Sequence, residues 1–256
     1  MLKTISWNIN GGSDPDWIRA VRQWLRNYKD VKAIGLQEIK AGEFRAEAGL
    51  RSIMRESNVV VDYAQNDKGG AAIIVSKELK LVDSGVKGDG SAAWVRVETE
   101  VGMIVLGDFN CVELPEDTQG ASNLLNGREL RRWKEMMRAS ELVDAFFVAV
   151  KRRGSRFTRQ RIRSDRVEFA RLDRCYFTEG ADWIEQVEEL HHDGTAALSD
   201  HYPVIVNICL VSKVKVQDAN WRSYFKFRVQ DFGSQEVKQQ VRLAWQAHPR
   251  RFGTRE

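Results

Sequence analysis

Residues 104–110 read IVLGDFN, a short apolar run that ends in an aspartate and an asparagine. Three further apolar runs, at residues 2–7, 33–36 and, more weakly, 196–198, also lead into polar side chains. Runs of this length are typical of buried strands, and side chains at strand ends can converge at one mouth of a sheet. The polar residues at these ends are Asn8, Glu38, Asp108, Asn110, Asp200 and His201.

Carboxylate and amide oxygens are ligands that suit a hard cation such as Mg²⁺. A histidine next to a carboxylate, as in Asp200-His201, adds a group that can move a proton or hold a phosphate oxygen. The pattern therefore predicts a hydrolase that cleaves phosphodiesters with the help of Mg²⁺ or Mn²⁺. Taken singly each motif is weak, because strand-end acids are common and a lone histidine is more often structural.

Size and composition favour one catalytic domain with an appendage. The chain has 256 residues, 43% of them hydrophobic, and a net charge of +4. It has no apolar run approaching the ~18 residues of a membrane span, and the first strand begins too early for a secretory leader. The three cysteines include no CxxC pair, so we expect neither a disulfide framework nor a zinc site. An intracellular protein without membrane contact is predicted.

The charges are unevenly distributed along the chain. Residues 151–174 carry ten basic and three acidic side chains, and residues 213–256 carry ten basic and four acidic ones. Residues 175–212 carry seven acids and neither lysine nor arginine. Basic segments beside an acidic metal mouth would attract a polyanion. We expect nucleic-acid contacts from the basic loop, the alternative being a solvated charged surface; the candidates are Arg152, Arg153, Arg156, Arg159, Arg161 and Arg163.

Periodicity predicts alternating strands and helices. Strands are expected at 2–8, 33–37, 59–61, 70–76, 79–82, 94–101 and 170–178, and helices from Asp14-Pro15, at 44–54, after Gly127 and at 235–245. Trp17, Trp24 and Tyr28 recur at helical spacing, as do Trp133 and Met136, and are expected to pack in the core rather than to stack on bases.

The order of the four motifs resembles that of the endonuclease/exonuclease/phosphatase superfamily, whose fold is DNase-I-like. The stretches GRELRRW at 127–133 and LVDA at 142–145 are similar to the endonuclease domain of plant-type long interspersed (non-LTR) retrotransposons. The resemblance implies an α/β fold, a four-layer α/β/β/α sandwich, over residues 1–212. It also implies that residues 213–256 are a basic helical tail similar to the linker that leads to a reverse transcriptase.

Two departures from the family pattern stand out. A strand and a helix, with the family's active-site tyrosine, are missing near Met103 and Ile104. From Trp94 to Phe109 only Gly102 signals a turn, so two strands would run end to end, far beyond the usual ~5–6 residues. We therefore expect weakened folding or catalysis. In addition, Arg159 stands where the family has a tryptophan near DNA.

The resemblance also implies roles for the candidate residues. Glu38, Asp200 and Asn10 would hold the metal, and Asp108 would position or deprotonate water, which Asn110 orients. Asn8 would hold the metal or a phosphate oxygen. Asp173 would orient His201, the alternative being a buried pair with Arg171 or Arg174. DNA is the implied partner of a monomer without a small-molecule cofactor, in the nucleus.

Two other functions remain open at the level of sequence. The chain could be an inactive retrotransposon remnant that binds nucleic acid, which the missing segment favours. It could also be an abasic-site endonuclease or another phosphoesterase of the superfamily, which would share the catalytic residues but not need the retrotransposon-like stretches.

Overall fold

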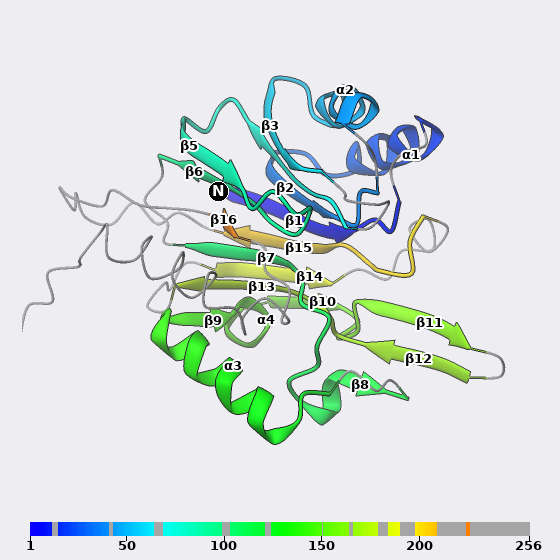
Figure 1. Ribbon diagram of the computed structural model, residues 1–256, viewed down its shortest axis with the longest axis vertical. Helices are drawn as coiled ribbons and strands as arrows, with labels where there is room; N and C mark the ends of the chain where they lie inside the picture. Colours follow the sequence, from blue (N-terminus) through cyan, green and yellow to red (C-terminus); the bar gives the residue numbers. More distant parts are fainter. Residues whose placement is uncertain are drawn as a thin grey trace, which may run out of the picture.

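The computed structural model (Figure 1) describes residues 1–11, 15–40, 43–63, 69–98, 103–120, 124–149, 151–163, 166–178, 184–189, 198–208 and 224–225. In chain order the elements are β1 (Leu2–Asn8), α1 (Pro15–Leu25), β2 (Val31–Gln37), α2 (Glu43–Ile53), β3 (Ser57–Asp62), β4 (Ala71–Ser76), β5 (Leu81–Val86), β6 (Ala93–Val97), β7 (Ile104–Asp108), η1 (Pro115–Asp117), β8 (Thr118–Gln119), α3 (Gly127–Ala139), β9 (Leu142–Asp144), α4 (Ala145–Val148), β10 (Lys151–Gly154), β11 (Arg159–Arg163), β12 (Arg166–Ala170), β13 (Asp173–Thr178), β14 (Ile184–Glu189), β15 (Val204–Ile208) and β16 (Tyr224–Phe225).

The larger sheet is seven-stranded, in the order β10-β14-β15-β1-β2-β4-β3. Its central strand β1 is parallel to β2 and antiparallel to β15. One face is covered by α1 and α2, whose apolar side chains form a core with the sheet. As expected, Trp24 of α1 is buried there against Trp7 of β1, and Trp17 and Tyr28 pack around them.

The second sheet has the order β16-β7-β13-β9 and faces the first. A shared core between the sheets contains Val204 and Val206 from β15, Leu106 from β7 and Phe177 from β13. On its outer side, α3 packs through Trp133, whose ring meets Phe109 edge-on. The layers are helix, sheet, sheet and helix, so the expected α/β/β/α sandwich is confirmed.

The expected long strand around residue 102 is wrong. The strand β6 ends at Val97 and pairs with β5 in a two-stranded sheet, whereas β7 begins at Ile104 and pairs with β13. Glu98 and Met103 are not in strands, and residues 99–102 lie outside the described residues. The two strands therefore belong to different sheets, although both contribute apolar side chains to the same core.

Other parts of the chain also differ from expectation. The basic segment is not a plain loop: β11 and β12 form an antiparallel hairpin that projects from the sandwich (Figure 1), with Arg161 paired to Glu168 in register. The strand expected at 170–178 begins at Asp173, and β5 covers 81–86 instead of 79–82. In the tail, β16 pairs in parallel with β7, and the helix expected at 235–245 lies outside the described residues.

Candidate active site

Four elements of the sandwich end at one place between the two sheets. Asn8 is the last residue of β1, Asp108 is the last of β7, and Asp173 is the first of β13. Because β7 and β13 are antiparallel with Asp108 opposite Asp173, their register alone puts the two carboxylates side by side. His201 arrives from the segment that leads into β15, the antiparallel neighbour of β1.

Asp108 is buried and held by two hydrogen bonds. The Asn8 side-chain amide donates to its Oδ2 over 2.8 Å, and the backbone N–H of Asn110 donates to its Oδ1 over 2.8 Å. Asn110 has φ +52°, a left-handed conformation that asparagine tolerates better than most residues. The GDFN sequence thus makes a tight turn that fixes the Asp108 carboxylate.

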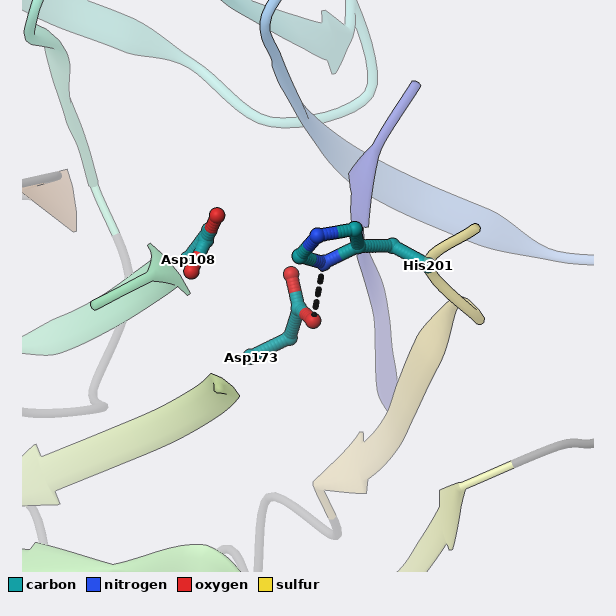
Figure 2. Close-up of side chains that lie close together, drawn as sticks. All are labelled: Asp108, Asp173 and His201. Carbon is teal, nitrogen blue, oxygen red and sulfur yellow. Dashed lines mark hydrogen bonds and ion pairs between the residues drawn. The ribbon is translucent and has the colours of Figure 1, made fainter. Parts of the chain in front are cut away.

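His201 is buried and paired with Asp173. The ring nitrogen Nδ1 lies 2.8 Å from Asp173 Oδ2, and Figure 2 shows the Asp173 carboxylate against the ring with Asp108 to one side. The alternative pairs with Arg171 and Arg174 are not what forms: Arg171 binds Asp144 through two hydrogen bonds, and Arg174 lies 3.3 Å from Glu113.

The charge state of this pair follows from its surroundings. Burial opposes a charge on His201, but the negative charges of Asp173 and Asp108 outweigh it and raise the pKa of His201 from 6.5 to about 9. Burial also raises the pKa of Asp173, against the opposing influence of the His201 charge. At neutral pH the histidine is therefore an imidazolium braced by a carboxylate.

Two residues that the sequence did not single out hold the site in shape. Thr158 Oγ1 accepts the backbone N–H groups of Leu172 and Asp173, over 3.0 and 2.9 Å. Ser199 Oγ donates to the Asn8 carbonyl over 2.7 Å and accepts the His201 N–H over 3.1 Å. A serine hydroxyl that accepts the backbone N–H two residues on forms a Ser turn, so Ser199 in LSDH was the available signal.

Asp200 lies next to this centre with different partners. Arg159 Nε is 3.2 Å from its Oδ2, and the Asn10 side-chain amide donates to its Oδ1 over 3.3 Å. The Asn10 amide oxygen accepts a hydrogen bond from the Lys40 ammonium. Of the three residues expected to hold metal, Asn10 and Asp200 therefore contact one another directly.

Glu38 follows the end of β2, whose last residue Gln37 is in register with Asn8. It has φ +54°, and its backbone carbonyl accepts the Gly11 N–H over 2.9 Å. Its carboxylate accepts the Gly69 N–H over 3.2 Å. Glu38 is therefore at the same end of the sheet as Asn8, with its side chain turned toward residue 69.

The six arginines expected to bind nucleic acid are not equivalent. Arg161 and Arg163 are exposed on the hairpin, and Arg152 and Arg153 are exposed on β10. Arg156 instead forms an ion pair with the buried Asp117, and Arg159 with Asp200. Of the exposed four, Arg163 also lies 3.7 Å from Glu168, and Arg152 donates to the Phe147 carbonyl.

The donor set of the site fits a hard cation. Among the described residues, ligand atoms of Asp108, Asp173 and His201 lie within 4.8 Å of one another. Asp173 Oδ1 is buried and has no hydrogen-bond partner in the described part of the chain. Because His201 is protonated, the oxygens of the acids and amides are the remaining donors, as Mg²⁺ or Mn²⁺ prefers.

Comparison with known proteins agrees with this geometry. The model of the endonuclease/exonuclease/phosphatase family matches residues 5–201, and the chain belongs to that family. The description of this family covers endonucleases, exonucleases and phosphatases. No curated protein matches the chain. Among the described residues, no helix is long and apolar enough to cross a membrane.

Several solved structures share the fold. An AP endonuclease from Leishmania major has a TM-score of 0.64 at 13% identity, covering 82% of this chain and 88% of its own. An AP endonuclease from Archaeoglobus fulgidus has a TM-score of 0.64 at 16% identity, with coverages of 82% and 100%. A 3′ phosphatase from Neisseria bound to a product DNA hairpin has a TM-score of 0.63 at 16% identity, with coverages of 82% and 100%.

Proposed function

We propose that this protein is a Mg²⁺-dependent endonuclease that nicks one strand of DNA, of the kind found in non-LTR retrotransposons. The observation that carries the proposal is the buried group formed by Asp108, Asp173 and His201, with Asn8 bonded to Asp108. A carboxylate, a braced imidazolium and oxygen donors for a cation are what phosphodiester hydrolysis requires.

Each residue has a role that its contacts define. Asp108, held on both oxygens, would orient the attacking water and accept its proton. His201, whose pKa is raised by Asp173 and Asp108, would donate a hydrogen bond to the phosphate oxygen that gains negative charge. Asp173 would keep the ring in place and protonated.

Glu38 would hold the cation at the mouth of the site, and Asn10 would join it only by exchanging the Lys40 ammonium that its amide oxygen now accepts. A bound Mg²⁺ would polarise the phosphate and offset its negative charge. Asn8 would fix Asp108 beside it, through the 2.8 Å hydrogen bond. The identity of the cation as Mg²⁺ or Mn²⁺ rests on the oxygen-rich donor set.

DNA as the substrate is supported by charge and by the comparisons. The exposed arginines Arg152, Arg153, Arg161 and Arg163 lie on β10 and the hairpin, where they can reach phosphates. A structural neighbour with the same fold holds a product DNA hairpin. Abasic-site cleavage is the second candidate, because two of the neighbours are AP endonucleases.

A plasmid-nicking assay with Mg²⁺ tests the proposal. The wild-type protein should convert supercoiled plasmid to the open circle, and Glu38→Ala and Asp108→Asn should lose at least about a hundredfold in rate. Glu98→Ala is the matched control, because that carboxylate pairs with Lys80 on the exposed surface. Equal nicking by wild type and both site variants would refute the metal site.

The competing functions give different results in the same experiment. An abasic-site enzyme would cut a duplex oligonucleotide with one abasic site far faster than the intact duplex. An inactive remnant would bind DNA at low salt without nicking either substrate, for the wild type and for Glu38→Ala alike.

A further inference from the structure

Arg159 is bound into the site rather than displayed to solvent. Its side chain is 17% exposed, and its Nε lies 3.2 Å from Oδ2 of Asp200, whose side chain is 32% exposed. The second Asp200 oxygen accepts the Asn10 amide over 3.3 Å. Both oxygens of this carboxylate therefore already have a partner, one of them carrying a positive charge.

The backbone around this ion pair is fastened as well. The Gln160 N–H donates to the Asp200 carbonyl over 3.0 Å, and the Tyr202 N–H donates to the Thr158 carbonyl over 2.7 Å. The Tyr202 hydroxyl also donates to the Gln160 side chain over 2.7 Å. Residues 158–160 and 200–202 thus form an antiparallel clasp, with Arg159 opposite His201.

We propose that Arg159 is a positioning residue that takes the place of a cation at Asp200, so that Asp200 braces the His201 segment and Asn10 instead of ligating metal. The inference rests on the proposed function, because it assigns the cation to the Glu38 side of the mouth. A divalent ion bound to Asp200 would have to displace the Arg159 guanidinium or lie next to it. In the second case the two positive charges would repel one another.

The clasp also joins the site to the basic hairpin. The strand β11 begins at Arg159 and carries Arg161 and Arg163 outward from the same backbone. The ion pair therefore fixes where the phosphate-binding arginines stand relative to His201. A lysine at position 159 would keep the charge but not the planar guanidinium.

A charge-balanced cycle tests the proposal. Mn²⁺ affinity is measured by electron paramagnetic resonance, without DNA, for wild type, Arg159→Gln, Asp200→Asn and the double variant. Removing both charges leaves the local net charge unchanged, so the double variant should bind Mn²⁺ within about threefold of wild type. Arg159→Gln alone should bind more tightly, because it frees a carboxylate next to the cation. A double variant that binds at least about tenfold more weakly would show Asp200 to be a ligand and overturn the proposal.

Thermal unfolding in EDTA gives a readout that needs neither metal nor activity. Each single variant should lower the Tm by a few degrees, and the double variant by no more than the larger single loss, because partners in one ion pair are not additive. Arg159→Lys should recover part of the loss. Fully additive losses would show that Arg159 and Asp200 do not act as one ion pair, and would overturn the proposal. If no variant binds Mn²⁺, the proposed metal function fails while this cycle still decides the role of Arg159.

Discussion

Replacing Asp173 with asparagine should leave His201 only partly charged at neutral pH. Asp173 supports the imidazolium over 2.8 Å, and the pKa of His201 is raised from 6.5 to about 9. That shift corresponds to about 3 kcal/mol of preference for the charged ring, at about 1.4 kcal/mol per pKa unit. In Asp173→Asn protein the burial of His201 remains while its main countercharge is gone, so its pKa should fall by about two units.

The pKa of His201 can be followed by NMR of protein with labelled histidine. The sequence contains four histidines, and the signal that disappears in His201→Gln assigns the one in the site. In the wild type this signal should titrate near pH 9. Nicking by Asp173→Asn should decline as pH rises above about 6, where the wild type still holds its proton. A His201 pKa near 9 that Asp173→Asn leaves unchanged would refute the reasoning.

The same pair fixes the sign of a pH effect on stability. A folded-state pKa above the unfolded value stabilises the protein fully below the unfolded pKa of 6.5, and this contribution is lost as pH rises toward about 9. The difference in unfolding free energy between wild type and His201→Gln should therefore be largest below pH 6.5 and shrink from there to pH 9. A difference that grows over that interval would contradict the charged pair.

Three further outcomes follow from the structure. Thr158→Val keeps the shape but removes the oxygen that accepts two buried N–H groups; it should cost about 1–3 kcal/mol in urea unfolding, and an unchanged midpoint would count against this role. Trp133→Ala should cost about 3–5 kcal/mol by opening the α3 interface, checked by the same method against the exposed Lys134→Ala. Replacing Arg161 and Arg163 with glutamine should reduce the salt slope of DNA binding by about two, and an unchanged slope would remove the hairpin from the interface.

The strand ends of the site were readable from the sequence, for a physical reason. An apolar run that closes with a polar residue predicts a strand and the end at which that residue lies, as for Asn8 and Asp108. The four layers were implied by the family resemblance, whereas the spacing of Trp24 and Trp133 predicted only that these side chains pack in the core. The prediction that Asp108 and Asp173 lie beside His201 required the family resemblance, because periodicity does not say which strands become neighbours.

Other contacts depend on register and could not be predicted. Arg159 was expected at DNA, and its ion pair with Asp200 exists because β11 lies opposite residues 200–202. The basic stretch was interpreted as a loop, because its many arginines leave no clear alternation of apolar and polar residues that would indicate the strands β11 and β12. Likewise, the hydrogen bond from the Gly69 N–H to the Glu38 carboxylate depends on the side-chain conformation of Glu38, which the spacing of residues in the sequence does not indicate.

The pairing of β16 with β7 has a practical consequence for handling this protein. Tyr224 and Phe225, which follow the family match in the sequence, lie alongside β7, the strand that ends in Asp108. A version shortened to residue 212 would retain the whole family match yet uncover the outer edge of β7, and bare strand edges invite self-association. Expression of the catalytic layers should therefore extend beyond Phe225, and a fusion partner joined there would begin beside β7.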